Sequence, residues 1–362
     1  MGATMQDVAL AAGVSIKTVS NVINDYPYIR PATRDRVLAA IDELGYRPNL
    51  SARGLRSGKT GIIGLAVPEL RENYFAELAD AVIRAAERSG LGVVVEQTNG
   101  DRETELRVLS RARTHYADGI LLSPVGMGQA DASLLDVPFP LVLLGERIFG
   151  GPVDHVTMHN VSSASAAVEH LLSIGRRQIA LVGAEGDDVS DASSWSLRVR
   201  GYRRALEHAG IPVHEHLVRR TEHWSRAGGA AAVHALIDER HDFDAVFALN
   251  DALALGVLRG LQEAGRRVPD DVAVVGFDNV DEGEFAVPSL TTVDPGREEI
   301  ARTAVALLVE RINEKGAKAA PRTVKAEFSI VSRESTGGAH GSARVGTDPV
   351  ASGAADAPRG AQ

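Results

Sequence analysis

A glycine between two short helical segments is the most constraining feature at the start of this chain. The first segment begins with Thr4, a residue type that can cap a helix, and carries Asp7 three positions later. Gly13 can adopt the left-handed conformation that ends this helix, and Ser15 can cap a second helix over residues 16–23. The pattern predicts a helix-turn-helix, an arrangement that small domains use to read DNA.

A third helical segment is predicted over residues 31–44, where Gly45 ends it. Four of its apolar residues recur at helical spacing and are expected to close a small core against the first two helices: Val37, Leu38, Ile41 and Leu44. Periodicity alone is equally compatible with a three-helix bundle that has another role.

The charge is distributed unevenly along the chain. The formal net charge is −9, but residues 1–58 hold seven Lys or Arg and five Asp or Glu, a balance of +2 that leaves −11 for the rest. Because phosphate attraction acts locally, a basic head on an acidic body is compatible with DNA binding.

The sequence contains no cysteine, which excludes disulfides and thiolate metal sites and favours a reducing compartment. The eleven histidines show no HExxH or similar ligand spacing, so neither a metal nor a cofactor is expected. The first residues do not read as a secretory signal, and no apolar run approaches the roughly 18 residues of a membrane span. We therefore expect a cytoplasmic protein with no membrane partner.

From Gly61 onward, short apolar runs alternate with amphipathic helical segments. Strands are expected in two groups, at residues 62–67, 92–96, 119–122 and 141–144, and at residues 179–182, 245–249 and 272–277. Helices are expected at residues 74–88, 161–174, 197–209, 227–240, 252–264 and 297–313. The pattern predicts an α/β body of two lobes, each a doubly wound parallel sheet, with a ligand cleft at the carboxyl ends of the strands.

Three stretches carry a resemblance to a known family: DVALAAGVSIKTVSNVIN, then Thr33-Arg34, then LGYRPNLSARGLRSGKTGIIGLAVP. They resemble the LacI/GalR-type regulators, and the similarity continues to about Ser335. The resemblance implies a helix-turn-helix head and a two-lobed body like the periplasmic binding proteins. It also implies a repressor of carbohydrate-utilisation genes whose affinity for a pseudo-palindromic operator is switched by a small-molecule effector, which we expect to be a sugar.

The resemblance assigns DNA contacts to the head and to the segment after it. Residues 15–24 correspond to the recognition helix, and residues 49–57 resemble a hinge helix that forms on operator DNA and wedges a leucine into the minor groove. The chemistry suits base reading, because Lys17 can donate to guanine and Asn21 can pair with adenine. The complete set of expected DNA contacts is Thr4, Ser15, Ile16, Lys17, Thr18, Ser20, Asn21, Asn24, Arg34, Ala52 and Leu55. For Ile16 the alternative is a place in the head core.

The expected effector contacts come from separate loops of the body. By resemblance, Arg198 clamps ligand hydroxyls or a carboxylate, Asn250 and Asp278 stand at strand ends, and Trp224 packs on a sugar ring. Tyr74, Phe75 and Ser123 are candidates from the first lobe. The alternatives are structural: Asn250 as a helix cap, Asp278 as a turn residue, Arg198 as a surface ion pair and Trp224 as core. At His159-Asn160, where many relatives carry Asp-Asn, the sequence departs from the family pattern.

The apolar pattern and the family resemblance together give the expected domain boundaries. Residues 1–48 form the head, 49–59 the hinge, 60–160 and 290–322 the first lobe, 161–289 and 323–335 the second lobe, and 336–362 a disordered tail. Residues 290–293 are expected to lead back to the first lobe. The tail is rich in Gly and Ala and has no leucine heptads, so we expect a homodimer rather than a tetramer.

The sequence gives less support to other classes of function. An enzyme is not expected, because no GxSxG, GxxxxGK[ST] or GxGxxG motif is present. A solute-binding protein of a transporter would share the two-lobed body but would carry an export signal in place of the head. A regulator that responds to a nucleoside or purine as corepressor remains an alternative to the sugar effector.

Overall fold

The computed structural model describes residues 3–23, 26–46, 59–112, 117–186, 191–316 and 319–338. The chain divides into two compact units, residues 1–62 and 63–362. The smaller unit holds the head, and the larger unit holds the body.

The head contains the three predicted helices, α1 (Met5–Ala12), α2 (Ile16–Ile23) and α3 (Pro31–Glu43). Thr4 and Asp7 form a reciprocal capping box at the start of α1, and Gly13 ends it with a φ of 63°. The backbone amide of Thr18 donates to the Ser15 hydroxyl at 3.1 Å, so Ser15 caps α2. The three capping predictions are confirmed.

The core of the head is smaller than the sequence suggested. Val8, Val19 and Val22 from α1 and α2 pack with Val37 from α3, and all four are buried. Leu38 and Leu44, which were expected in this core, are 49% and 38% exposed. The remaining space is filled by the buried ring of Tyr46, which follows the turn at Gly45.

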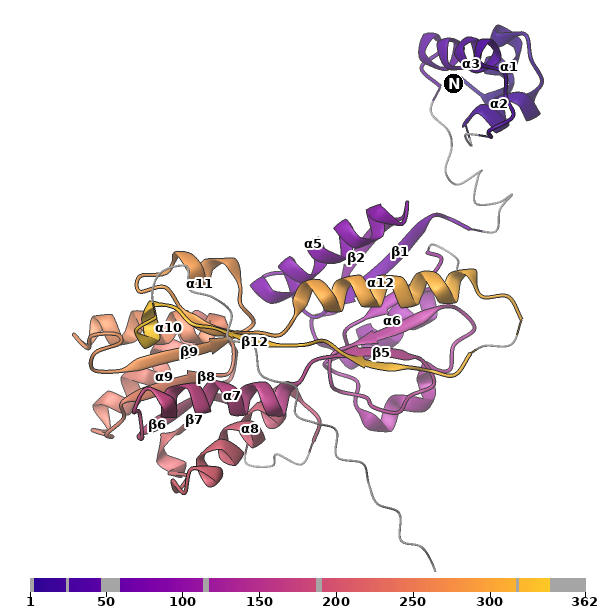
Figure 1. Ribbon diagram of the computed structural model, residues 1–362. Helices are drawn as coiled ribbons and strands as arrows, with labels where there is room; N and C mark the ends of the chain where they lie inside the picture. The colour runs from indigo at the N-terminus through magenta and orange to yellow at the C-terminus, as the bar shows by residue number, and fades with distance from the viewer. Residues whose placement is uncertain are drawn as a thin grey trace, which may run out of the picture. The chain divides into compact units, whose positions relative to one another are not determined.

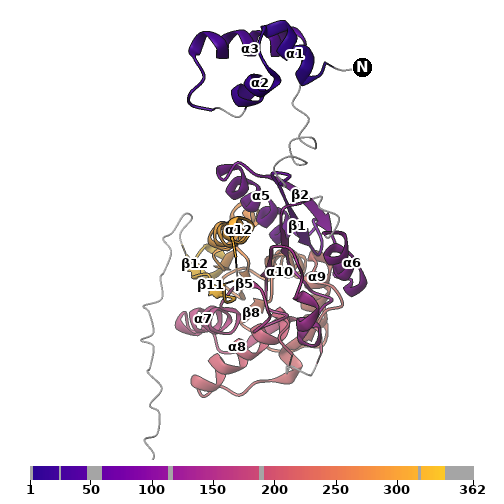
Figure 2. The ribbon, with the colours of Figure 1, turned by 90° about the vertical axis from the view of Figure 1, so that its right-hand side faces the viewer.

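The first lobe is built on a six-stranded sheet with helices on both faces (Figure 1). In spatial order its strands are β11 (Thr323–Lys325), β5 (Asp154–Thr157), β4 (Leu141–Leu144), β3 (Ile120–Leu122), β1 (Ile62–Val67) and β2 (Gly92–Gln97). One face packs against α5 (Asn73–Arg88) and α12 (Arg297–Asn313), which lie side by side in Figures 1 and 2. The other packs against α6 (Arg102–Ala112) and a 3₁₀ helix, η1 (Gln129–Leu135).

The second lobe repeats this plan with a different edge strand. Its sheet runs β12 (Ser329–Val331), β10 (Thr291–Asp294), β9 (Ala273–Phe277), β8 (Ala245–Ala248), β6 (Ile179–Ala184) and β7 (Val218–Arg220). Only β12 pairs antiparallel to its neighbour among the strand pairs described. Its helices are α7 (Asn160–Ser173), α8 (Ser194–His208), α9 (Arg226–Asp238), α10 (Asp251–Glu263) and α11 (Asp281–Phe285), with 3₁₀ turns η2 (Glu215–Leu217) and η3 (Glu334–Thr336). The predicted fold class is confirmed.

The chain passes between the lobes three times, and two of these passages differ from the expected boundaries. Residues 291–294 form β10 of the second sheet rather than a return to the first lobe, because they pair in parallel with β9. Residues 323–325 form β11 of the first sheet, in parallel with β5, although they were expected in the second lobe. Thr336, expected in the tail, is buried and hydrogen-bonded to Thr291. Gly337 and Gly338 of the expected tail are also described, and residues 339–362 lie outside the described residues.

Two helix pairs in the second lobe approach each other closely at glycines. A Cβ on Gly201 of α8 would clash with the carbonyl oxygen of Val161 in α7. A Cβ on Gly256 of α10 would clash with the carbonyl oxygen of Arg226 in α9. Absence of a side chain at these positions lets the helices pack backbone to backbone, which sets the positions of their N-terminal residues.

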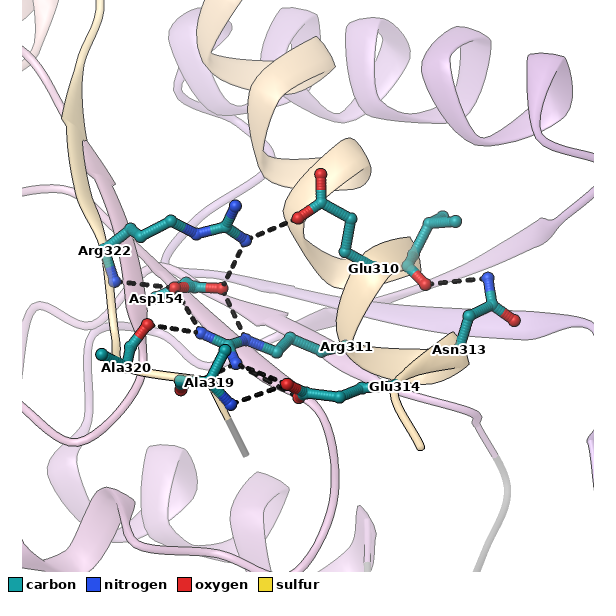
Figure 3. Close-up of polar contacts among 9 residues, drawn as sticks. Asp154, Glu310, Arg311, Asn313, Glu314, Ala319, Ala320 and Arg322 are labelled. Carbon is teal, nitrogen blue, oxygen red and sulfur yellow. Dashed lines mark hydrogen bonds and ion pairs between the residues drawn. The ribbon is translucent and has the colours of Figure 1, made fainter. Parts of the chain in front are cut away.

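A buried carboxylate ties the last part of the chain to the first lobe (Figure 3). Asp154, fully buried at the start of β5, accepts hydrogen bonds from Arg311 Nε and Nη2 at 2.8 and 2.9 Å. It also accepts from the backbone amide of Arg322 at 2.8 Å, beside β11. Burial acts to raise the pKa of Asp154, but these hydrogen bonds outweigh it and lower the pKa below its ordinary value.

Removal of this carboxylate is expected to destabilise the body. Asp154→Ala removes the buried carboxylate that pairs with the largely buried guanidinium of Arg311 and leaves Glu314 as the remaining acidic partner, so the free energy of unfolding should fall by about 3 kcal/mol, the low end of the range for a broken buried ion pair. Because the folded-state pKa is lowered, the stabilisation is present at neutral pH and is lost as pH falls through that lowered pKa. Both tryptophans lie in the body, so urea unfolding followed by their fluorescence measures the effect.

Asp270→Ala is the matched control, because Asp270 pairs with Arg267 on the surface. It should change the free energy of unfolding by less than about 1 kcal/mol. An equal effect of the two substitutions would contradict the role assigned to Asp154.

Candidate effector and DNA sites

A cavity of about 700 Å³ lies at the carboxyl ends of both sheets of the body, a volume in the usual range of about 300–1,000 Å³ for ligand pockets. The loops after β1, β3 and β4 line it from the first lobe, and those after β6, β8 and β9 line it from the second. All seven effector residues expected from the sequence lie on this lining: Tyr74, Phe75, Ser123, Arg198, Trp224, Asn250 and Asp278. Residues from both lobes thus converge on one cavity.

Arg198 lies in the first turns of α8 and is only 4% exposed. Its Nε donates to Asn160 Oδ1 at 2.9 Å, and its Nη1 donates to the carbonyl oxygen of Leu249. Its guanidinium carbon lies 3.5 Å from the centre of the Phe277 ring. The sequence led us to expect a guanidinium fork free for a ligand, but most of its donors bind other parts of the protein.

Asp278 follows β9 with a φ of 116°, an unusual conformation for a residue other than glycine. Its carboxylate is 6% exposed and lies 3.6 Å from Arg198 Nη2, and it makes no hydrogen bond with the residues that the structure describes. Burial raises the pKa of Asp278 well above its ordinary value, although Arg198 opposes the shift. A buried acceptor on a cavity wall without a hydrogen-bond partner is suited to accept from a ligand hydroxyl.

Asn250 combines a structural role with a chemical one. Its Oδ1 accepts from the backbone amide of Leu253 at 2.8 Å and caps α10, as the structural alternative held. Its Nδ2 makes no hydrogen bond with described residues, and the side chain lies on the cavity lining. The amide group can therefore donate to a ligand while its oxygen holds the helix.

Aromatic rings form much of the apolar lining. The Trp224 indole donates to the Gly183 carbonyl at 2.8 Å, which fixes the ring while part of it stays exposed. Tyr74 and Phe75, in the first turn of α5, pack edge to face with ring centres 5.2 Å apart. Trp195, which lies in α8 and is buried, also lines the cavity. Such rings offer flat apolar surfaces for the faces of a bound ligand.

Two residues of this site were missed by the sequence reasoning. Asn160, the first residue of α7, accepts from Arg198 and donates from Nδ2 to Glu146 Oε1 at 2.6 Å. Glu146 follows β4, lines the cavity and is 7% exposed. A polar pair after a buried strand was the available signal for Glu146. The neighbouring His159 packs near Phe328 and is not among the lining residues.

The DNA candidates of the head lie mainly on its accessible surface. Ser15, Ile16 and Lys17 of the capping turn and first turn of α2 are exposed, with Ile16 40% exposed, so Ile16 is not a core residue. Thr4 is exposed, whereas Thr18, Ser20 and Asn21 are partly buried. Arg34 donates from Nη2 to the carbonyl oxygen of Tyr26 at 3.1 Å. Three further candidates lie outside the described residues: Asn24, Ala52 and Leu55.

No group of three or more His, Cys, Asp or Glu side chains is arranged to hold a metal ion in the part of the chain that the structure describes. Within the same residues, no helix has both the length and the apolar character needed to cross a membrane.

Comparison with known proteins places the chain in a family. Residues 4–49 match the family described as bacterial regulatory proteins, lacI family, and residues 168–336 match the periplasmic binding protein-like domain. Catabolite control protein A of Priestia megaterium is 32% identical over 316 residues, which cover 87% of this chain and 94% of that protein. The chain therefore belongs to the lacI family of bacterial regulatory proteins and is a DNA-binding transcription regulator, as the resemblance implied.

Solved structures give the same result. A transcriptional regulator of the LacI family from Sanguibacter keddieii is 51% identical, covers 77% of this chain and 99% of its own, and has a TM-score of 0.71. The CelR–cellobiose complex is 33% identical, with 92% and 99% coverage and a TM-score of 0.66. The lac repressor dimer bound to operator is 27% identical, with 93% and 99% coverage and a TM-score of 0.77.

The dual role of Asn250 can be tested by stability alone. Asn250→Ala removes the cap of α10 and should lower the free energy of unfolding by about 1 kcal/mol. Asn250→Ser keeps a capping oxygen and should be nearly as stable as the wild type in the same urea titration. A serine variant as unstable as the alanine variant would show that the amide, rather than the cap, supports the fold.

Proposed function

We propose that this protein is a repressor of carbohydrate-utilisation genes and that a sugar bound in the body cavity switches its affinity for operator DNA. The observation that carries the proposal is the Asp278 carboxylate, which makes no hydrogen bond with the described residues and lies beside Arg198 and Asn250 on a cavity wall rich in aromatic rings. The cellobiose and ribose complexes among the similar structures support a sugar.

Each group has a distinct task toward a sugar. Asp278 accepts hydrogen bonds from ligand hydroxyls, and the Asn250 amide donates to a hydroxyl or ring oxygen. Trp224 and Tyr74 present ring surfaces to the apolar faces of the pyranose or furanose ring. Arg198 orients the polar groups around it through Asn160 and Leu249, and it keeps Nη2 directed toward Asp278.

Contacts between the lobes offer a route from the cavity to the head. Arg147 of the first lobe pairs with Asp191 of the second at 3.0 Å, and the Asp281 amide donates to Glu77 at 3.0 Å. A ligand held by both lobes changes the free energy of their closure, and the first lobe continues directly into residues 49–59. Operator affinity and effector affinity are then reciprocally coupled, commonly by about 5-fold to 150-fold.

The DNA target follows from the same proposal. Two heads of a homodimer would bind a pseudo-palindromic operator, with Lys17 and Asn21 reading base edges and Leu55 entering the minor groove. The lac repressor, solved as a dimer on its operator, supports this arrangement.

If Lys17 reads a base, its replacement should weaken DNA binding by an amount that depends on the DNA sequence. On an operator selected from a randomised DNA pool, Lys17→Ala should lose about 1–3 kcal/mol of binding free energy per half-site and relax preference at one base pair. Arg34→Ala, the comparator for phosphate contact, should weaken all sequences alike. Uniform losses for Lys17→Ala on every DNA tested by anisotropy would remove lysine from base reading.

If Asp278 binds the effector, its replacement should give a protein that binds operator DNA but no longer responds to the sugar. Asp278→Asn keeps the side-chain shape but loses the charged acceptor, so it should leave operator affinity without effector unchanged and abolish the response to the sugar. Operator affinity is measured across a panel of sugars for the wild type, for this variant and for Asp270→Asn, a surface control. A normal response by Asp278→Asn would refute the assignment, and a wild type that responds only to nucleosides or purines would refute the sugar.

A further inference from the structure

The charges around the cavity restrict which sugars it can hold. We propose that the cavity selects an uncharged saccharide and rejects the phosphorylated or carboxylated forms of the same sugar, and that Glu146 determines this specificity. The inference rests on the proposed function and narrows its class of effector.

Every arginine on the cavity lining is already engaged by a carboxylate. Arg71 pairs with Glu69 at 2.5 Å, and Arg147 pairs with Asp191 at 3.0 Å. Arg226 pairs with Glu282, and Arg198 is held by Asn160, Leu249 and Asp278. No lysine is among the lining residues that the structure describes, and the neighbouring residues 187–190 include neither Lys nor Arg. The lining therefore offers an anion no arginine or lysine without an acidic partner.

Carboxylates, by contrast, are in excess. Glu146 and Asp278 are both more than nine-tenths buried, and Arg198 is the one buried cation near them on the described lining. Glu146 is hydrogen-bonded to the neutral amide of Asn160 and pairs with no cation among the described residues. Glu72 also lines the cavity at the start of α5, but burial and the nearby Glu69 raise its pKa to about 7, so it carries only part of a negative charge at neutral pH. Burial raises the pKa of Glu146 as well, and Arg198 and the hydrogen bond from Asn160 oppose that shift.

This charge balance separates neutral ligands from anions. A phosphate or carboxylate that enters the cavity loses its hydration next to buried negative charge, and no free cation compensates for that loss. A hydroxyl instead donates to the same carboxylates, and hydrogen bonds to charged acceptors are stronger than neutral ones. At the N-terminus of α10, a common place for anions, Asp251 already occupies the first position.

The test compares each neutral sugar with its anionic form on the full chain. Isothermal titration with glucose and glucose 6-phosphate, ribose and ribose 5-phosphate, and cellobiose and cellobionate gives a dissociation constant for every member. For the pair whose neutral sugar binds, the anionic form should bind at least about tenfold more weakly. An anion that binds as tightly as its neutral partner, or more tightly, overturns the inference while the proposed sugar effector stands.

A charge-neutral variant tests the part assigned to Glu146. Glu146→Gln keeps an oxygen for Asn160 and should reduce the discrimination against the anionic sugar by about tenfold, because one buried charge is gone. Glu222→Gln is the matched control, since Glu222 also lines the cavity but is exposed, and it should leave the ratio unchanged.

The outcomes separate the rejection of anions from the role of Glu146 in it. If Glu146→Gln folds, as judged by its thermal unfolding, and keeps the wild-type ratio, Glu146 does not determine the specificity. If it does not fold, the wild-type pairs alone decide whether anions are rejected. If no saccharide binds the wild type, the proposed function fails, and this inference fails with it.

Discussion

The body depends most on the hydrogen bonds and the ion pair of the buried Arg198 guanidinium. A charge that is 4% exposed must be matched by acceptors, and its acceptors come from three separate places: Asn160 at the start of α7, the carbonyl of Leu249 after β8, and Asp278 after β9. Asn160 in turn binds Glu146 of the first lobe. One hydrogen-bonded chain thus joins both lobes at the floor of the cavity.

This network requires that the helices carrying it lie close to the sheet and to each other. Gly201 follows Arg198 by one turn and allows the backbones of α7 and α8 to touch, which brings Asn160 within reach of the guanidinium. Gly256 does the same for α9 and α10, whose N-termini carry Arg226 and Asp251 at the cavity end. The polar site is therefore a consequence of helix packing that only glycine permits.

The same network explains why the site suits recognition of hydroxyl groups. Most donors of Arg198 bind the protein, so it acts mainly to compensate and orient the acidic groups around it, and Asp278 keeps its carboxylate available as an acceptor for a ligand. The head shows the opposite arrangement, with Ser15, Ile16 and Lys17 exposed on a small core of valines. The proposed effector site thus consists of buried polar groups, whereas the proposed DNA contacts are exposed.

The amino-acid sequence by itself determined the local features of this protein. Thr4, Gly13 and Ser15 act through hydrogen bonds and dihedral angles within a few residues, so the helices of the head followed from the sequence. The alternation of apolar runs and helices determined the two-lobed class. The family resemblance supplied four of the effector candidates that line the cavity, and the positions of strand ends supplied Tyr74, Phe75 and Ser123.

Only the tertiary structure decided what those residues bind. The partners of Arg198 lie 38 and 51 positions away, and Arg311 reaches Asp154 across 157 positions, so no local pattern encodes these contacts. β10 and β11 were expected in the wrong lobes because pairing with another strand decides which sheet a strand joins. β11 pairs with β5, far away in the chain, whereas β10 pairs with β9, the strand just before it. Glu146 belongs to the site because Asn160, at the start of α7, donates a hydrogen bond to it.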